Sequence, residues 1–440
     1  MGANGPGVDA GLGSGLTLWA PPGSEGRLPK PNLPGRGGAA GAMITLQARA
    51  EAALCDTYHR LPVTLVRGEG AWVFTEGGAQ LLDMVAGVAV SVLGHAHPAL
   101  VDAISTQAAA LIHTGNVAYS EPQVRLAERL VSGAFPARVF FSNSGAEANE
   151  AAIKIARKWG RLRRGGAHVV VTLTGAFHGR TLGALAATGL PRYCDPFSPI
   201  PTGFRKVACG DLEALEAALD DQTAAVLLEP IQGESGVVPL SDAYLAAVRQ
   251  LCDRHGCLLM VDEVQSGMAR TGRLWAHQWA DIRPDVMTVA KGLAGGVPIG
   301  ATLVAPHADV LEPGDHGSTF GGGPLASAAG LAVLATIERD RLAERAEEVG
   351  ARLMSRLGQL RDSGAPILDL RGRGLMVGLT LRRPVAAAVA EAAVGEGLLV
   401  NAVGRRTLRL VPPLILTEEQ ADLAVERLGA ALELGGRRAS

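Results

Sequence analysis

The amino-acid sequence predicts an α/β protein with a large domain, built on a central and mostly parallel sheet, and a smaller α+β domain. Three observations support this. Short, nearly continuous apolar runs alternate with amphipathic helical patterns, which is typical of parallel strands covered by helices on both faces. Beyond Pro324 the pattern changes, and strands are grouped with helices. The length, 440 residues, exceeds what one hydrophobic core usually supports.

We expect four segments along the chain. Residues 1–42 are rich in Gly and Pro and almost lack apolar periodicity, so they predict a disordered extension. Residues 43–95 are expected to be the N-terminal segment of the small domain. Residues 96–330 are expected to form the large, cofactor-binding domain, and residues 331–440 the C-terminal part of the small domain. Met43, which heads the first helical pattern, is an alternative start of translation.

Individual elements follow from the periodicity of apolar residues. After a short entry segment of mixed helix and strand, the pattern predicts helices at 97–113, 121–132 and 146–163 and strands at 169–173, 224–229, 257–262 and 286–290. Beyond Pro324 it predicts helices at 325–337 and 341–360, strands near 367–371 and 375–381, and then a helix, a strand and a final helix. We find no internal repeats.

The composition argues against several classes of partner. The chain is 48% hydrophobic and 19% charged, and its formal net charge of -2 gives no electrostatic reason to bind nucleic acid or an anionic membrane. No apolar run reaches the roughly 18 residues of a membrane span, and the N-terminus lacks the pattern of a signal peptide. We therefore expect a cytoplasmic protein with small-molecule partners, no nucleic acid and no membrane.

The five cysteines are scattered and form no C-x-x-C motif, which indicates reduced thiols in the cytoplasm. Cys252, His255 and Cys257 lie close together in the sequence and could be imagined as metal ligands. Because Cys252 belongs to an amphipathic helix and Cys257 opens the next strand, buried thiols are the favoured interpretation, and we expect no metal site.

Two charged residues stand just past predicted strands, Asp262 in VDEVQSG and Lys291 in VAKGL. In open α/β sheets ligands bind beyond the carboxyl ends of the strands, so both side chains are expected in one crevice. Pyridoxal 5'-phosphate (PLP) needs a lysine amine to bond to its aldehyde and a carboxylate to keep its pyridine nitrogen protonated. The pair therefore predicts a PLP site.

Two further loops fit this cofactor. Ser144, Gly145 and Ala146 lie between a strand and a helix, where free backbone N–H groups can bind a phosphate; an ordinary capped helix start is the alternative. Phe177 follows the next strand and could stack on a pyridine ring, although core packing is the commoner role of a single Phe. We assign no catalytic role to His178.

Three other features of the sequence concern charge. Glu229 and Glu234 follow a buried strand directly, so they are expected to pair with a cation or with loop N–H groups. Ser318 and Thr319 precede three glycines, and their hydroxyl groups suit a phosphate. Arg409 lies in an apolar strand. It is expected either to be a surface residue with a buried stem or to bind a carboxylate in bidentate fashion.

Seven segments, in chain order, resemble the class III (omega) aminotransferases, which are fold-type I PLP-dependent transferases, and among them the acetylornithine aminotransferases most. The segments are SNSGAEANEAAIKIAR, GAFHGRTLGALAATG, EPIQGESGV, VDEVQSGMARTG, AKGLAGGVPIGA, HGSTFGG and LRLVPPL. The resemblance covers the chain from about Tyr58 to the C-terminus. Several long motifs in one order make chance similarity very unlikely.

The resemblance implies a role for each residue of the cofactor site. Lys291 would bond to PLP and later move a proton between the substrate carbon and the cofactor, while Asp262 would hold the pyridinium. Gln265 would hold the phenolate oxygen and Phe177 would cover the ring face. The other implied cofactor-binding residues are Ser144, Gly145, Ala146, Glu263, Val264 and, reaching across from a partner subunit of a homodimer with shared active sites, Thr319.

The resemblance also implies the substrates. Arg180 and Ser318, with Tyr58 as a weaker candidate, would hold the carboxylated end of N-acetylornithine. Arg409 would grip the α-carboxylate of glutamate or 2-oxoglutarate, and Glu234 would pair with Arg409 when the amino donor is bound. One site would then serve two substrates, because Glu234 masks Arg409 for the first and releases it for the second. The implied reaction moves the terminal amine of N-acetylornithine to 2-oxoglutarate, in arginine biosynthesis.

Departures from the family pattern leave alternatives open. Gly323 and Gly115 replace the usual Asn and Ser, although no charged catalytic group is lost. Val88 stands where ornithine aminotransferases carry a Tyr, which argues against free ornithine but leaves acetyl-lysine, other N-blocked diamines and 4-aminobutyrate as donors. A PLP-dependent aminomutase, such as glutamate-1-semialdehyde aminomutase, and a non-catalytic α/β binding module are the alternatives from other classes.

Overall fold

The computed structural model describes residues 45–438. The predicted extension, residues 1–42, therefore lies outside the described residues. The chain divides into two compact units after Pro62. The described part of the first unit carries helix α1 (Leu46–Ala53), which Thr45 caps by accepting a hydrogen bond from the Ala48 N–H at 3.2 Å. Everything below concerns the second unit, from Val63 onward.

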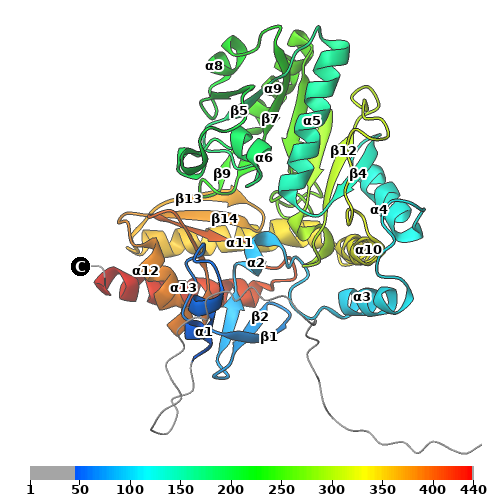
Figure 1. Cartoon of the computed structure of the whole chain (residues 1–440). Coiled ribbons are helices and arrows are strands. Elements are labelled where there is room, and N and C mark those ends of the chain that lie inside the picture. Colours follow the sequence, from blue (N-terminus) through cyan, green and yellow to red (C-terminus); the bar gives the residue numbers. More distant parts are fainter. Residues whose placement is uncertain (1–44, 439–440) are drawn as a thin grey trace, which may run out of the picture. The chain divides into compact units, whose positions relative to one another are not determined.

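A seven-stranded sheet forms the centre of the large layered part of this unit (Figure 1). All of its neighbouring strands are parallel except at β12, which runs antiparallel to both of its neighbours. This confirms the mostly parallel sheet that the sequence predicted. Its strands, in spatial order, are β4 (Arg138–Ser142), β12 (Gly300–Val304), β11 (Val286–Val289), β10 (Leu258–Asp262), β7 (Thr223–Leu228), β5 (Val169–Leu173) and β6 (Phe204–Val207).

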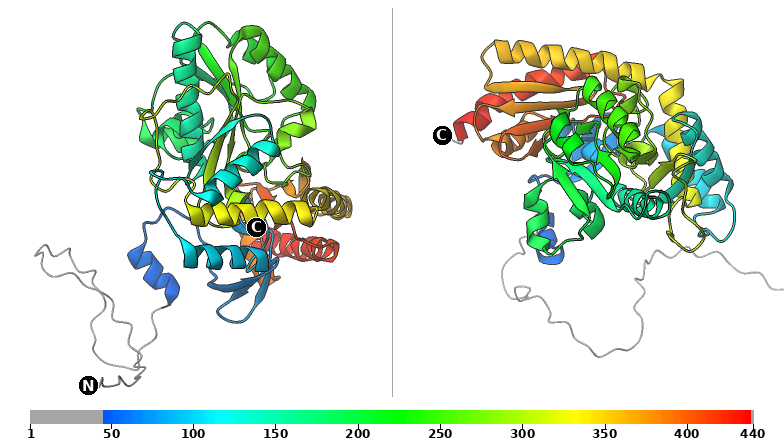
Figure 2. Two further views of the ribbon diagram at one scale, coloured as in Figure 1. Left: turned by 90° about the vertical axis from the view of Figure 1, so that its right-hand side faces the viewer. Right: turned by 90° about the horizontal axis from the view of Figure 1, so that it is seen from above.

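Both faces of this sheet are covered, which explains why its central strands are apolar throughout. Successive residues of a strand point to opposite faces. In β7, Val226 and Leu228 pack with apolar residues of α9 (Asp242–His255), whereas Ala225 and Leu227 pack with those of α5 (Gly145–Arg163). Figure 2 shows the two helices on opposite sides of the sheet. Cys252 and Cys257 are buried in the cluster on the α9 face.

The helices that surround this sheet begin and end close to the predicted positions. Helix α4 has the predicted bounds, while α3 ends three residues before the predicted end. The remaining helices of this part are α3 (Pro98–Ala110), α4 (Glu121–Ser132), α6 (Leu182–Ala187), α7 (Pro191–Cys194), α8 (Leu212–Ala217) and α10 (Pro324–Arg339), and its remaining strands are β8 (Ile231–Gln232) and β9 (Val238–Pro239). Three short 3-10 helices lie at 195–197, 276–280 and 291–294. The short element α2 (Ala86–Ala89) contains a left-handed turn.

A second, antiparallel sheet follows α10 and has the order β13-β14-β17-β16. In Figure 1 it lies between the large sheet and the three helices α11 (Leu342–Asp362), α12 (Ala386–Gly395) and α13 (Glu418–Arg438). This is the α+β grouping that the sequence predicted. The strands are β13 (Ile367–Arg373), β14 (Met376–Leu381), β16 (Asn401–Val403) and β17 (Thr407–Leu410).

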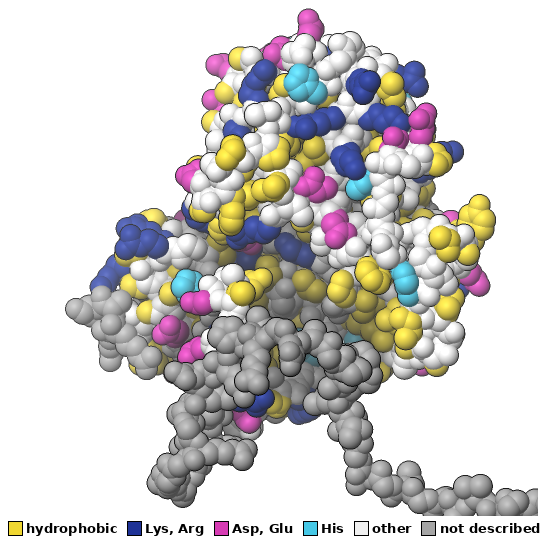
Figure 3. All heavy atoms as spheres, in the orientation of Figure 1, with side chains coloured by type: hydrophobic (Ala, Val, Ile, Leu, Met, Phe, Trp, Pro, Cys, Tyr) yellow, Lys and Arg dark blue, Asp and Glu magenta, His cyan; other side chains and the backbone are white. Residues whose placement is uncertain are grey.

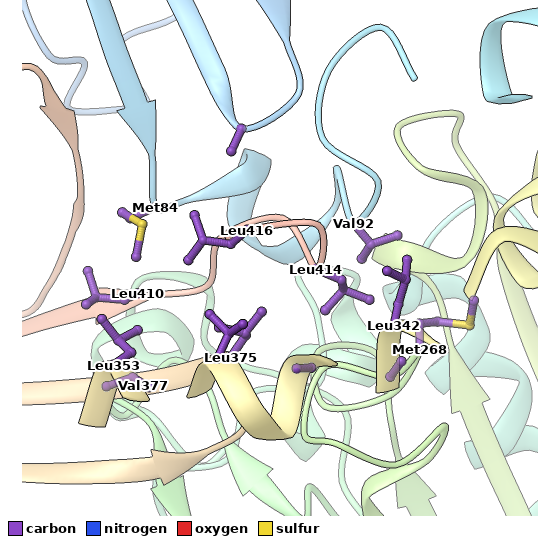
Figure 4. Close-up of a cluster of buried hydrophobic side chains, with 14 of the residues drawn as sticks. Met84, Val92, Met268, Leu342, Leu353, Leu375, Val377, Leu410, Leu414 and Leu416 are labelled. Atoms are coloured by element: carbon purple, nitrogen blue, oxygen red, sulfur yellow. The ribbon is translucent and has the colours of Figure 1, made fainter. Parts of the chain in front are cut away.

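A third sheet joins the two ends of the unit. Strand β3 (Gln80–Asp83) pairs with β2 (Trp72–Thr75), which pairs with β1 (Leu65–Glu69), and on its other edge β3 pairs in parallel with β15 (Leu398–Leu399). Figure 4 shows how Met84, Leu353 and Leu410 meet in one buried cluster. Residues between 65 and 95 therefore share a sheet and a core with residues after 331, while the division into separate domains stays a prediction.

Two strands of the seven-stranded sheet were not expected from the sequence. Strand β12 begins with Gly300 and Ala301. Because these residues have a low preference for strands, the sequence lacks the run of large apolar residues that predicts a buried strand. Strand β6 reads FRKV and lies at the edge of the sheet, where one side can carry charge. None of the described helices has both the length and the apolar content needed to span a membrane. Figure 3 shows basic and acidic side chains interspersed over one face.

Candidate active site

A cavity of about 430 Å³ opens at the carboxyl ends of β4, β5, β7, β10 and β11. Asp262, at the end of β10, and Lys291, two residues after β11, both line it, as the topological argument from the sequence expected. The other predicted site residues that line this cavity are Ser144, Gly145, Ala146, Phe177, Arg180, Val264 and Gln265.

The Asp262 carboxylate is buried and accepts three hydrogen bonds. Its Oδ2 accepts from Asn149 Nδ2 at 2.7 Å and from His178 Nδ1 at 2.8 Å, and its Oδ1 accepts from the Val264 N–H at 2.9 Å. Asn149 is itself held by Thr288, whose hydroxyl donates to its Oδ1 at 2.8 Å. These donors satisfy the buried carboxylate oxygens and fix their orientation. The sequence signalled neither Asn149 nor His178 as its partner.

The Lys291 amine is the candidate nucleophile of the site. Burial, together with the positive charge of Arg409, lowers the pKa of Lys291 to about 8, against the opposing effects of Glu234, Asp262 and Glu229. A fraction of the amine is therefore neutral near pH 7, as addition to a carbonyl requires. The residue begins a 3-10 turn with φ of 43°, a left-handed conformation that costs energy outside glycine and that is concentrated at functional sites.

The first turn of α5 provides an anion site. Ser144 caps the helix, and its Oγ accepts from the Glu147 N–H at 3.2 Å, which leaves the N–H groups of Gly145 and Ala146 directed at the cavity end of the helix. Space is tight here. A Cβ on Gly145 would lie 2.6 Å from Cγ1 of Val264.

Glu229 holds two loops of the site together. Its Oε1 accepts from the Phe177 N–H at 2.8 Å and its Oε2 from the Gly233 N–H at 3.2 Å, which confirms the expectation of a loop-bonded carboxylate. Burial raises the pKa of Glu229 to about 7; the nearby His178 opposes this shift and the charge of Asp262 adds to it. The aromatic loop and the loop of Glu234 are thus fixed to one side chain.

Arg409 on β17 is buried, and its guanidinium is shared among four acceptors. Its Nη1 donates to Glu234 Oε1 at 2.7 Å, to the Gly233 carbonyl at 3.2 Å and to Gln265 Oε1 at 3.2 Å, while Nη2 donates to Asn401 Oδ1 at 2.8 Å. Although burial tends to raise the pKa of Glu234, the charges of Arg409, Lys291 and Arg180 lower it overall. The structure therefore brings the predicted pair into an ion pair, and Asn401 is a partner that the sequence did not indicate.

Five predicted residues of the second unit are not part of the lining of this cavity: Arg409 and Glu234, whose ion pair is described above, and Glu263, Ser318 and Thr319. The Glu263 carboxylate accepts from Ser266 and His277 instead. Ser318 Oγ accepts from the Gly321 N–H at 3.0 Å and from Asn143 Nδ2 at 3.1 Å, and its neighbour Thr319 is exposed. Tyr58 belongs to the first unit, where it is 71% exposed and the Arg60 guanidinium lies 5.5 Å from its ring centroid. Their roles stay predictions.

These residues fit PLP chemically, since one cavity combines an amine of lowered pKa, a buried carboxylate, a helix N-terminus and an aromatic ring. When bound, PLP supplies an electron sink and a carrier for an amino group. The fold and the site together define a PLP-dependent enzyme of fold type I.

The comparisons with known proteins give the family. The model of the family "Aminotransferase class-III" matches residues 54–432, and the chain belongs to the class III aminotransferases. It is therefore a PLP-dependent transaminase. It is 52% identical over 380 residues to acetylornithine aminotransferase 1 of Bordetella bronchiseptica, covering 86% of this chain and 96% of that one. It is 48% identical to the acetylornithine aminotransferase of Mycobacterium tuberculosis, covering 90% and 98%.

Solved structures agree with this family. The ornithine aminotransferase of Toxoplasma gondii superimposes with a TM-score of 0.86 at 33% identity, covering 89% of this chain and 95% of that one. The N-acetylornithine aminotransferase of Stenotrophomonas maltophilia has a TM-score of 0.76 at 39% identity, covering 87% and 98%.

Proposed function

We propose that this enzyme moves the terminal amino group of N-acetyl-L-ornithine to 2-oxoglutarate, giving N-acetylglutamate 5-semialdehyde and glutamate, a step of arginine biosynthesis. The observation that carries this proposal is the Glu234–Arg409 ion pair beside Lys291. It allows the site to alternate between an uncharged amine chain and a dicarboxylate. The names of relatives that are about half identical over most of their length support the same donor.

Each residue of the site has a separate role in this proposal. The Lys291 amine, in its neutral form, would bond to the cofactor and would carry a proton to and from the substrate carbon. Asp262 would keep the proton on the pyridine nitrogen. Because Arg409 can only donate, Gln265 faces it with Oε1, so the Gln265 Nε2 group would be the donor to the phenolate oxygen. Phe177 would hold the ring of the cofactor, and the start of α5 would hold its phosphate.

The enzyme is inferred to work as a homodimer with shared active sites. Val117, Tyr119 and Phe320 are 93%, 100% and 64% exposed, which is unusual for such side chains in a monomer. They lie on two loops that are bonded to each other, since Asn116 Nδ2 donates to the Ser318 carbonyl at 3.1 Å. A second copy packed on these loops would cover the apolar side chains and place the exposed Thr319 at the partner's site.

The cell compartment is inferred from the state of the cysteine thiols. All five cysteines are free thiols, and three of them are buried. This state fits a reducing compartment, and we propose the cytoplasm.

The donor is tested by comparing turnover of N-acetylornithine, acetyl-lysine, ornithine and 4-aminobutyrate, with glutamate formed from 2-oxoglutarate as the readout. We expect the highest kcat/KM with N-acetylornithine, and a violet absorbance band of bound cofactor that is lost in Lys291→Ala. A higher kcat/KM with ornithine would overturn the donor assignment. Isomerisation of an amine without any 2-oxoglutarate would indicate a mutase instead.

A further inference from the structure

Two guanidinium groups lie over the ring of Tyr193 beside the active-site cavity. The Cζ atoms of Arg180 and Arg192 are 3.7 and 4.8 Å from the ring centroid. Arg192 Nη2 is 3.4 Å from the Tyr193 hydroxyl oxygen and 3.4 Å from the Glu234 carbonyl oxygen. The ring also meets Phe177 edge-on, with centroids 5.8 Å apart. Tyr193 thus connects both arginines to the residue that covers the cofactor.

Neither arginine has a carboxylate partner in the part of the chain that the structure describes. Glu234 is close enough to Arg180 for that charge to lower its pKa, yet its carboxylate is bonded to Arg409. Both Arg180 and Arg192 are exposed, and Arg180 lines the cavity. The donor edges of two cations are therefore available to an anionic ligand at one side of the cavity.

We propose that Tyr193 is a positioning residue that fixes the Arg180 guanidinium, and that Arg192 is a second group that binds the carboxylate of the amino donor. This rests on the proposed function, which gives the donor a carboxylate remote from the transferred amine. A long arginine side chain on the surface samples many rotamers. Stacking on an aromatic face restricts the guanidinium plane and leaves its N–H edges for a carboxylate.

The proposal predicts an effect on one substrate only. In the proposed function the keto acid binds through Arg409, which has no contact with Tyr193 among the described hydrogen bonds and ring contacts, so loss of the Tyr193 ring should leave the KM for 2-oxoglutarate unchanged. The donor without its carboxylate, N-acetyl-1,4-diaminobutane, should also be unaffected, because it has nothing for the two arginines to bind. The preference of the enzyme for N-acetylornithine over this diamine measures the contribution of the carboxylate.

The experiment measures that preference as a ratio of kcat/KM values. We expect Tyr193→Leu and Arg192→Gln each to lower it by about two- to fivefold. Tyr193→Phe, which keeps the aromatic face, should stay near the wild-type ratio. In an Arg180→Ala background, Tyr193→Leu should cause no further loss, because the ring acts through that arginine. Arg273→Gln removes a matched arginine that is stacked on Trp279 at 4.6 Å and should leave the ratio unchanged.

Two results would overturn the inference. One is that Tyr193→Leu lowers kcat/KM for both amines equally, which would make the ring a structural support. The other is that it still lowers the ratio when Arg180 is absent. Failure of the proposed function is distinguishable, because the wild-type enzyme would then not transfer the amine of N-acetylornithine at all.

Discussion

Three hydrogen-bond donors converge on the buried carboxylate of Asp262. One of them, Asn149, lies 113 residues earlier in the chain, and another, His178, lies 84 residues earlier. A carboxylate after a buried strand is visible in the sequence, but its tertiary neighbours are not, because strand order decides which loops meet. The charged members of the site were therefore predicted, and the side chains that hold Asp262 in place were found only in the structure.

Replacement of Asp262 tests the electrostatic role. Asp262→Asn preserves the size of the side chain and removes its charge, so the pyridine nitrogen loses its anion. We expect kcat to fall by about 10²–10³ while thermal unfolding changes little. Steady-state kinetics and circular-dichroism melting measure the two quantities. As a control, Asp369→Asn removes an exposed carboxylate bonded to Arg371 and should leave kcat unchanged; an Asp262→Asn enzyme with full activity would contradict the role.

The lowered pKa of Lys291 has a consequence for stability. Below pH 8 the amine is charged in both the folded and unfolded states, and the cofactor-free protein carries the cost of burying that charge. Between about pH 8 and the ordinary lysine pKa of 10.5 the unfolded state binds more protons at this residue than the folded state, so stability rises with pH.

Lys291→Met should therefore raise the urea midpoint of the cofactor-free protein at pH 7, and this advantage should disappear above about pH 10.5. Urea unfolding of both proteins across pH 6–11, followed by fluorescence, measures it. An advantage that grows with rising pH would have the wrong sign and would reject the pKa assignment.

At the scale of single elements, the N-terminus of α5 is defined by its contact with the loop after β10. The sequence predicted this helix to within one residue of its start, because a strand, a Ser cap and a glycine stand in order. The left-handed turn at 86–89 was not predicted, since Val88 has φ of 67°, which local sequence preference disfavours. Packing against neighbouring residues overrides the local preference there.

Gly145→Ala tests the close approach at this helix. The added Cβ would lie 2.6 Å from Val264, so the first turn must shift away from the cofactor phosphate. We expect the dissociation constant of PLP to rise by about tenfold, an effect of roughly 1.4 kcal/mol, without the loss of any charge. Titration of the cofactor-free protein measures it. Val264→Ala in the same chain removes the obstructing methyl groups and should restore affinity; if it does not, the tight contact is not the cause.

At the scale of the whole molecule, the exposed apolar loops predict assembly. The chain has a mass of 45.3 kDa, and we expect light scattering to give about twice that value. Val117→Asp places a charge where the second copy is proposed to pack, so it should produce monomers and reduce activity. Leu182→Asp, at another exposed apolar residue (57% exposed), is the control and should remain dimeric. A wild-type monomer with full activity would exclude shared active sites.

Strand β3 can complete its sheet only with β15, which is roughly 300 residues later in the chain. A ribosome must therefore release nearly the whole polypeptide before the edge formed by residues 80–83 is covered. Until then the nascent chain exposes an unpaired strand, a surface that favours intermolecular pairing and that chaperones can protect. The first sheet of this unit should accordingly complete its pairing only after the segment that contains Leu398 and Leu399 has left the ribosome.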